Sequence, residues 1–211
     1  MTHQGRASGT TEAILVWDAP TRLGHWLLAA AFLTAWLTSE GESWKNVHIG
    51  AGAVVFVIAL FRIIWGFAGS RYARFAEFTR SPKVTLGYLR SLLSTTPHHF
   101  VGHNPAGGYV INLLLILALI SCVSGYLAYN DIGSLSESIH ESASEGMLLL
   151  VLTHIAGVIV ASTLHRENLI RAMVTGRKSG RANDAIVGNS RIVAVLLLAL
   201  AGTGYWLSRY L

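Results

Sequence analysis

Four histidines stand out because apolar residues surround them. His154 lies within "GMLLLVLTHIAGVIV", and His140 precedes it by fourteen residues in "ESIHESASE". His25 opens the run "HWLLAAAFL", and His48 opens "HIGAGAVVFVIAL". A neutral imidazole is a common ligand for metals, and an ionisable side chain inside an apolar span is costly and usually functional. These four histidines are therefore the first candidates for chemistry.

Other reactive residue patterns are missing from the sequence. Cys122 is the only cysteine, which excludes an intrachain disulfide, a C-x-x-C-H haem attachment and a multi-cysteine iron–sulfur site. The sequence also lacks a Walker A loop, a dinucleotide-binding G-x-G-x-x-G after a strand and a G-x-S-x-G motif. His98, His99 and His103 lie in a polar segment, where we expect solvated side chains rather than a metal site. His103 directly precedes the next apolar run.

The helices that carry the histidines can be predicted from composition. Of the 211 residues, 52% are hydrophobic and only 13% are charged, against about a quarter in a typical soluble domain. Long apolar runs alternate with short polar ones, as in a polytopic membrane protein. We predict an all-α integral membrane protein, with a four-helix transmembrane bundle and a fifth, C-terminal transmembrane helix. The spans fall at residues 23–38, 49–68, 109–129, 146–164 and 192–207. Asp18 with Pro20, and Asn104 with Pro105, are typical of helix starts.

The distribution of Lys and Arg predicts the orientation of these spans. Basic residues gather in the segments that follow the second and the fourth span, namely Arg71, Arg74, Arg80, Lys83, Arg90, Arg166, Arg171, Arg177, Lys178, Arg181 and Arg191. The positive-inside rule therefore places the N-terminus in the cytoplasm and the C-terminus in the periplasm. The net charge of +5 does not indicate nucleic-acid binding, because membrane topology explains where the basic residues lie.

This orientation pairs the four histidines by depth. The fourteen residues from His140 to His154 make nearly four helical turns, so both lie on one helix face about 21 Å apart. His25 and His154 then lie toward the cytoplasm, and His48 and His140 toward the periplasm. Each pair could clamp one planar macrocycle between two helices. His25 is nearer its helix end than His154, so the first pair requires a tilted or protruding helix. A single histidine at a helix end would instead be an ordinary interfacial residue.

Two arginines could bind the haem periphery. Arg62 lies near the inner end of the second span, fourteen residues after His48. A buried arginine needs an anion, and a haem propionate would serve. The simpler interpretation is that Arg62 extends to anionic lipid. Arg22 is a second candidate for a propionate contact. Glycines within four residues of the histidines could let a flat ring approach the backbone, namely Gly24, Gly52 and Gly157.

The sequence resembles the bacterial cytochrome b561 family, which includes the b-type cytochrome subunits of nickel–iron hydrogenases. The resemblance lies in "WDAPTRLGHWLL", "HIGAGAVVFVIALFRIIWGFAGSRYARF", "GHNPAGG" and "HESASEGMLLLVLTHIAGVIVASTLHRENLIRAM". It implies two b haems with paired axial histidines, which fall on His25 with His154 and on His48 with His140. It also implies a bacterial inner-membrane location and electron exchange with quinone. We expect a cytochrome b561-like membrane domain at residues 1–175, followed at 176–211 by a basic linker and the C-terminal helix, in which this chain departs from the family.

The expected function is transmembrane electron transfer between the quinone pool and a redox partner. That partner is a periplasmic c-type cytochrome or a hydrogenase-like enzyme, so the chain is an electron carrier or a subunit of a quinone-linked oxidoreductase. A homodimer is left open. Two alternatives are a superoxide oxidase that passes electrons to quinone, and a histidine-containing metal or proton transporter, which should show polar or broken helices at mid-membrane. The acidic residues of the predicted outer loops would attract a partner with a basic face.

Overall fold

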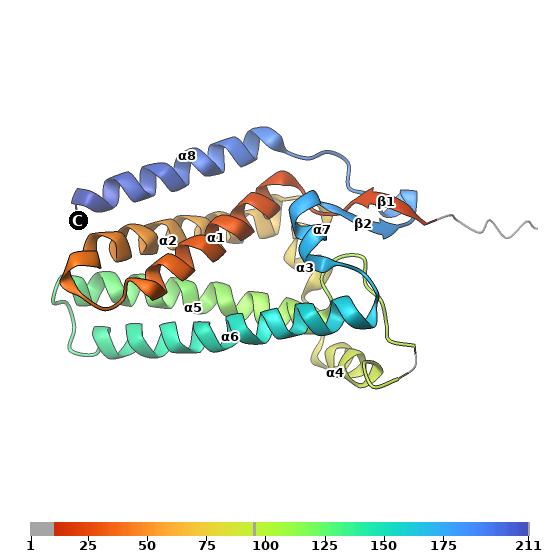
Figure 1. Ribbon diagram of the computed structural model, residues 1–211, viewed down its shortest axis with the longest axis horizontal. Helices are drawn as coiled ribbons and strands as arrows, with labels where there is room; N and C mark the ends of the chain where they lie inside the picture. The colour runs from red at the N-terminus through yellow and green to blue at the C-terminus, as the bar shows by residue number, and fades with distance from the viewer. Residues whose placement is uncertain (1–10, 95, 211) are drawn as a thin grey trace, which may run out of the picture.

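The computed structural model describes residues 11–94 and 96–210. In this part of the chain, five long helices run along the long axis of the molecule (Figure 1), namely α1 (Ala19–Leu37), α2 (Lys45–Ala68), α5 (Pro105–Tyr129), α6 (Ser136–Leu164) and α8 (Arg191–Leu207). The shorter elements are the helices α3 (Phe75–Phe78), α4 (Pro82–Ser91) and α7 (Leu169–Thr175), the strands β1 (Glu12–Leu15) and β2 (Arg177–Gly180), and the 3₁₀ turns η1 (Glu42–Trp44), η2 (Arg71–Ala73), η3 (Ala182–Asp184) and η4 (Ser208–Tyr210). The prediction of a largely α-helical membrane protein is confirmed.

Four of the described helices have the length and apolar composition to cross a membrane. They are α5, α6, α2 together with η1, and α8 together with η4. The predicted spans two to five coincide with these four helices. α1 is not among them, because Thr21, Arg22 and His25 lower the mean hydropathy of its first turns. It nevertheless forms a continuous helix and packs against both α2 and α8.

Both helix starts predicted from the sequence are confirmed. The Asp18 Oδ1 accepts a hydrogen bond of 2.9 Å from the Thr21 backbone N–H at the start of α1. The Asn104 Oδ1 accepts one of 2.7 Å from the Gly107 N–H at the start of α5. A proline follows each cap in the first turn, where its missing N–H costs nothing. These caps define where the two helices begin.

Four long helices, α1, α2, α5 and α6, begin four or more residues before the apolar runs that predicted them. α6 begins at Ser136, ten residues before the predicted start at 146, so that His140 lies within the same helix as His154. α1, α2 and α5 each begin four residues early. An apolar run marks the part of a helix that suits lipid, whereas the helix itself continues through polar residues such as Glu137 and Glu141.

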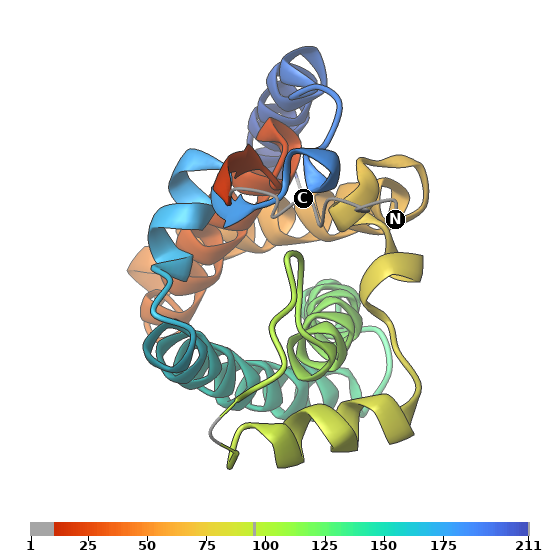
Figure 2. The same cartoon turned by 90° about the vertical axis from the view of Figure 1, so that its right-hand side faces the viewer.

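The long helices form layers, which Figure 2 shows end-on. α1 and α2 lie between α8 on one side and the α5–α6 pair on the other, and the contacts between these helices agree with that order. The core between α1, α2, α5 and α6 is built from small and medium side chains, namely Ala31, Val55, Ala59, Leu115, Ala118 and Met147. α8 packs through the fully buried Leu197 against Ile58 of α2 and close to Gly24 of α1.

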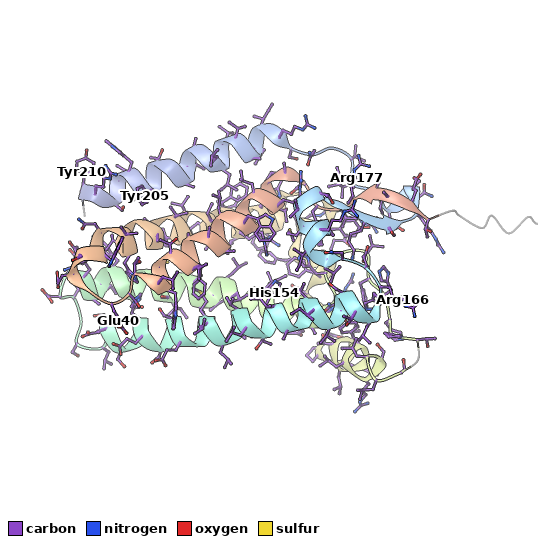
Figure 3. All side chains as sticks on the ribbon, viewed as in Figure 1. Glu40, His154, Arg166, Arg177, Tyr205 and Tyr210 are labelled. Carbon is purple, nitrogen blue, oxygen red and sulfur yellow. The ribbon has the colours of Figure 1, made fainter. Side chains whose placement is uncertain are left out.

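The two ends of this bundle carry opposite charges. Figure 3 shows Arg166 and Arg177 at one end, and Glu40 with Tyr205 and Tyr210 at the other. We call the first the basic end, where α1, α5 and α8 begin, and the second the acidic end, where α2 and α6 begin. Exposed acids outnumber exposed bases at the acidic end, where Glu40, Glu42, Asp131, Glu137 and Glu141 lie with Lys45 and Arg209.

A short β-ribbon closes the basic end, and the sequence did not predict it. β1 pairs antiparallel with β2, with Glu12 opposite Gly180 and Leu15 opposite Arg177. Gly176 has a positive φ of 81°, and its carbonyl accepts hydrogen bonds from the N–H groups of Val16 (2.8 Å) and Trp17 (3.1 Å). The ribbon joins residues on both sides of the predicted domain boundary at 175–176, and that division stays a prediction.

Candidate functional site: two histidine pairs

The first pair lies toward the basic end and joins α1 to α6. The ring centroids of His25 and His154 are 6.3 Å apart, with 52° between the ring planes. Figure 3 labels His154 on α6. The difference in depth noted from the sequence is absorbed by a protruding helix, since α6 continues ten residues past His154 while His25 is six residues after the start of α1.

The second pair lies toward the acidic end and joins α2 to α6. The ring centroids of His48 and His140 are 6.0 Å apart, with 81° between the planes. α6 therefore contributes one histidine to each pair. The structure brings together the residues that the depth argument paired, and their role as ligands stays a prediction.

The spacing of both pairs suits one metal ion held between two imidazoles. Metal–imidazole bonds of about 2.0–2.1 Å separate opposed nitrogens by about 4 Å, and thus ring centres by about 6 Å. Among the described residues, no group of three or more His, Cys, Asp or Glu side chains could hold a metal ion. Two opposed imidazoles without further protein ligands fit a macrocycle, which supplies the in-plane ligands itself.

The acidic-end histidines are oriented by backbone carbonyls. The His48 Nδ1 lies 2.8 Å from the Ala35 carbonyl oxygen, and the His140 Nδ1 lies 2.8 Å from that of Ser121. Since a carbonyl only accepts, each Nδ1 must carry the proton. In the neutral form of each ring, Nε2 then carries no proton and is the nitrogen that can bind a metal.

Gly125 is fitted closely to one of these rings. A Cβ atom at this position would lie 2.7 Å from the His140 Nδ1 and 2.9 Å from its Cε1. Only glycine at this point of α5 therefore lets the His140 ring pack beside the helix. The sequence analysis missed this residue, because nothing in the spacing along α5 relates it to a histidine on α6.

The glycines considered from the sequence behave differently from one another. A Cβ on Gly52 or Gly157 would meet no atom within 4 Å, so space remains beside both. A Cβ on Gly24 would instead meet Leu197 of α8 at 3.4 Å. Gly24 therefore serves helix packing, whereas Gly52 and Gly157 leave room for a flat group.

Arg62 is enclosed near the basic end. Both of its terminal nitrogens are shielded from solvent and have no hydrogen-bond partner among the described residues. The guanidinium carbon lies 5.4 Å from the Phe75 ring centroid and 5.6 Å from that of Phe78. Since these nitrogens are buried, the side chain does not extend to lipid headgroups, which was the simpler interpretation of the sequence. An anion bound beside Arg62 would satisfy it.

Arg22 already has protein partners. Its Nη1 donates a 2.7 Å hydrogen bond to the Val174 carbonyl, and its Nη2 lies 3.4 Å from the Asn189 Oδ1. These bonds tie the start of α1 to the end of α7 and to the segment before α8. The contact between Arg22 and a propionate stays a prediction, and Arg62 has the freer donors.

His103 is the residue whose environment the sequence analysis misjudged. We expected a solvated loop side chain, but its Nδ1 is buried and has no partner among the described residues. Its ring centroid lies 4.5 Å from that of Trp17 and 4.9 Å from that of Phe78. Burial, reinforced by the charge of Arg62, holds the pKa of His103 well below its usual range. His103 is thus a neutral imidazole close to Arg62.

The neighbouring histidines behave as surface residues. His98 is exposed, and the His99 Nε2 lies 3.5 Å from the Glu167 Oε2. The same Glu167 pairs with the buried Lys178 at 3.0 Å. This ionic cluster connects the segment before α5 to the segment after α6 and to β2, and so stabilises the basic end.

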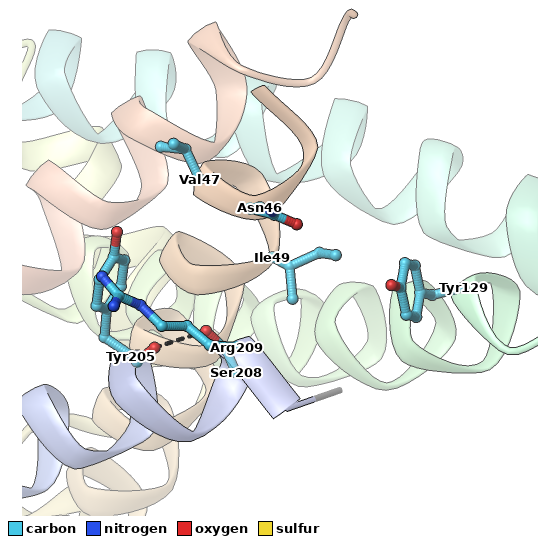
Figure 4. A pocket seen from close by; sticks show the side chains of 7 residues that line it. All are labelled: Asn46, Val47, Ile49, Tyr129, Tyr205, Ser208 and Arg209. Carbon is cyan, nitrogen blue, oxygen red and sulfur yellow. Dashed lines mark hydrogen bonds between the residues drawn. The ribbon is translucent and has the colours of Figure 1, made fainter. Parts of the chain in front are cut away.

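A hollow at the acidic end is built partly by the C-terminal segment. Figure 4 shows its lining, namely Asn46, Val47, Ile49, Tyr129, Tyr205, Ser208 and Arg209. α2, α5 and the residues around η4 meet there, next in sequence to His48. The sequence analysis did not predict this hollow, because it depends on how α8 packs.

With these features described, comparison with known proteins identifies the class. A sequence model of the prokaryotic cytochrome b561 family matches residues 16–176, which is most of the chain. The chain belongs to this family. It is therefore a membrane-bound b-type cytochrome, which binds haem b and transfers electrons.

The relatives carry a more particular name. Proteins named "Probable Ni/Fe-hydrogenase B-type cytochrome subunit" match from Rhizobium leguminosarum bv. viciae, with 24% identity over 79% of this chain and 89% of the relative, and from Cupriavidus necator, with 25% identity over 82% and 90%. The "Probable Ni/Fe-hydrogenase 1 B-type cytochrome subunit" of Escherichia coli K12 is 23% identical over 78% and 90%. No solved structure matches the chain.

Proposed function

We propose that this chain is a di-haem electron carrier of the bacterial inner membrane. His25 and His154 are the axial ligands of one haem b, and His48 and His140 are those of the other. The observation that carries this proposal is the pairing itself. Two pairs of rings, with centroids 6.3 Å and 6.0 Å apart, lie at two depths and share α6.

The chemistry supplied by bound haem b is one-electron exchange at its iron. The two histidines of each pair would hold the iron of one haem and leave it no free position for a substrate, so this chain would relay electrons. His140 and His154 are about 21 Å apart along α6, so the two sites lie toward opposite faces of a hydrocarbon core about 30 Å thick. The carbonyls of Ala35 and Ser121 hold two of the ligands in orientation.

The charge of the two ends supports one orientation in the membrane. By the positive-inside rule, the basic end faces the cytoplasm and the acidic end faces the periplasm. The N-terminus is then cytoplasmic and the C-terminus periplasmic. Electrons pass between membrane quinone and a redox partner that docks at the acidic end. The names of the relatives favour a hydrogenase-like enzyme as this partner over a soluble c-type cytochrome.

Two other functions are less well supported. The exposed acids of the acidic end would repel the superoxide anion, which opposes a superoxide oxidase that works from that side. A metal transporter needs a protein-built metal site, and none is found among the residues that the structure describes.

The experiment that tests the proposal measures haem content in the purified full chain. A pyridine haemochrome assay should give two haem b per chain, and acid acetone should extract both, since no cysteine is placed to attach them. Electron paramagnetic resonance should show two low-spin ferric signals. A single haem per chain, or a high-spin signal from an iron with an open axial position, would contradict the double pairing.

A further inference from the structure

Buried donors without acceptors gather beside the basic-end pair. Both terminal nitrogens of Arg62 and the Nδ1 of His103 are shielded from solvent and have no partner among the described residues. A buried polar group without a hydrogen-bond partner destabilises the fold, and more so when it is charged. Such a cluster of donors therefore indicates that an acceptor binds there.

Aromatic side chains hold the two donors in place. Arg62 and His103 both pack on Phe78, with the guanidinium carbon 5.6 Å and the imidazole centroid 4.9 Å from its ring centroid. Phe75 covers Arg62 from another direction, and Trp17 covers His103. These rings exclude water, which strengthens any charge-assisted hydrogen bond formed inside them.

The buried carboxylate of Asp18 already has hydrogen-bond donors of its own. The Asp18 Oδ1 accepts the Thr21 N–H at 2.9 Å, and its Oδ2 accepts the Trp65 Nε1–H at 3.0 Å. Asp18 has no solvent exposure and caps α1. Its role is therefore structural, and the donors of Arg62 and His103 remain available to a second carboxylate.

We propose that Arg62 and His103 form a carboxylate-binding subsite, which holds a propionate of the haem bound by His25 and His154. The proposal rests on the proposed function and adds His103 to the site. Arg62 supplies the balancing charge, and His103 is a positioning residue that donates a neutral hydrogen bond from Nδ1. A negatively charged propionate stabilises ferric iron, which carries more positive charge than ferrous iron. Because Arg62 neutralises the propionate, this stabilisation is lost and the subsite raises the reduction potential of this haem.

The test is a redox titration of the full chain with substitutions at both donors. Arg62→Gln should lower the ratio of reduced to oxidised basic-end haem about tenfold at a given applied potential. For a one-electron couple, this corresponds to a reduction potential lower by about 59 mV. His103→Leu should act in the same direction by a smaller factor. His103→Asn should restore most of the effect, because its amide nitrogen can take the place of Nδ1. The matched control is His98→Leu, an exposed histidine of the same segment.

The outcomes separate this proposal from the proposed function. The potential of the basic-end haem could stay unchanged in both Arg62→Gln and His103→Leu while the chain still holds two haems. That result would overturn the subsite but not the proposed function. Equal shifts of both haems would overturn the subsite as well. If His103→Leu loses the basic-end haem, recovery of that haem in His103→Asn supports the hydrogen bond, and failure to recover assigns His103 to packing. An unsubstituted chain without haem contradicts the proposed function and this inference together.

Discussion

The two histidine pairs share α6 but have opposite surroundings. At the acidic end, carbonyls of Ala35 and Ser121 accept hydrogen bonds from His48 and His140. At the basic end, the Nδ1 of His25 is buried and has no acceptor among the described residues. Exposed acids lie at the same end of the bundle as the first pair, whereas the enclosed Arg62 lies near the second. The same ligand type is therefore placed in two different electrostatic settings.

This difference sets an order for the two sites. A hydrogen bond from Nδ1 makes the imidazole a stronger donor, which stabilises ferric iron, and nearby carboxylates act in the same direction. On the proposed function, both effects would lower the reduction potential of the acidic-end haem. A buried cation, and a histidine without that hydrogen bond, would raise the reduction potential of the basic-end haem. Electrons that enter at the acidic end would then move downhill toward the basic end.

Removal of a histidine ligand should have the largest effect, because it should empty one of the two sites. His154→Leu should empty the basic-end site, and His140→Leu should empty the acidic-end site, so that haem content falls from two to one per chain in each variant. The pyridine haemochrome ratio and the remaining low-spin signal measure which site is left. His98→Leu should keep both haems. Retention of both signals in His154→Leu would refute the assignment of this pair.

Gly125→Ala should affect the acidic-end site alone. The added methyl group would lie 2.7 Å from the His140 Nδ1, so the ring must move out of its hydrogen bond. Overpacking of this kind costs about 1–3 kcal/mol, which should weaken haem binding there about tenfold. Haem release to apomyoglobin measures the change. The control is Gly202→Ala on α8, where an added Cβ meets nothing within 4 Å.

The order of the potentials can be measured once each site is isolated. His154→Leu should retain only the acidic-end haem, and His140→Leu only the basic-end haem. The reduction potential of the acidic-end haem should be lower by at least about 59 mV, which is a tenfold change in the ratio of reduced to oxidised haem. Equal potentials in the two variants would contradict the proposed difference between the two sites.

Reversal of charge at the acidic end should have the smallest effect, because it should change only the rate of association with a partner. Asp131→Lys with Glu137→Lys should slow electron transfer to a partner with a basic face and flatten its dependence on salt, because the Debye length falls from about 30 Å at 0.01 M to about 8 Å at 0.15 M. Stopped-flow rates measure this, and both haem spectra should stay unchanged. Electron-transfer rates that change neither with salt concentration nor with these substitutions would indicate a partner held by other contacts.

The amino-acid sequence determined the elements along the chain and the depth of each candidate ligand. Apolar runs predicted the spans that coincide with α2, α5, α6 and α8, and the rise of about 1.5 Å per residue fixed the separation of His140 and His154. Residue types predicted the caps at Asp18 and Asn104. These features are local or follow from the regular geometry of a helix, so no knowledge of packing is needed to predict them.

Only the tertiary structure decided what lies beside each histidine. The burial of Arg62, the insertion of His103 between Trp17 and Phe78, and the contact of Gly125 with His140 all depend on how separate helices pack. The β-ribbon depends likewise on pairing between segments at opposite ends of the chain. Such distances result from side-chain volumes summed over several helices, and a spacing within one helix carries no information about them.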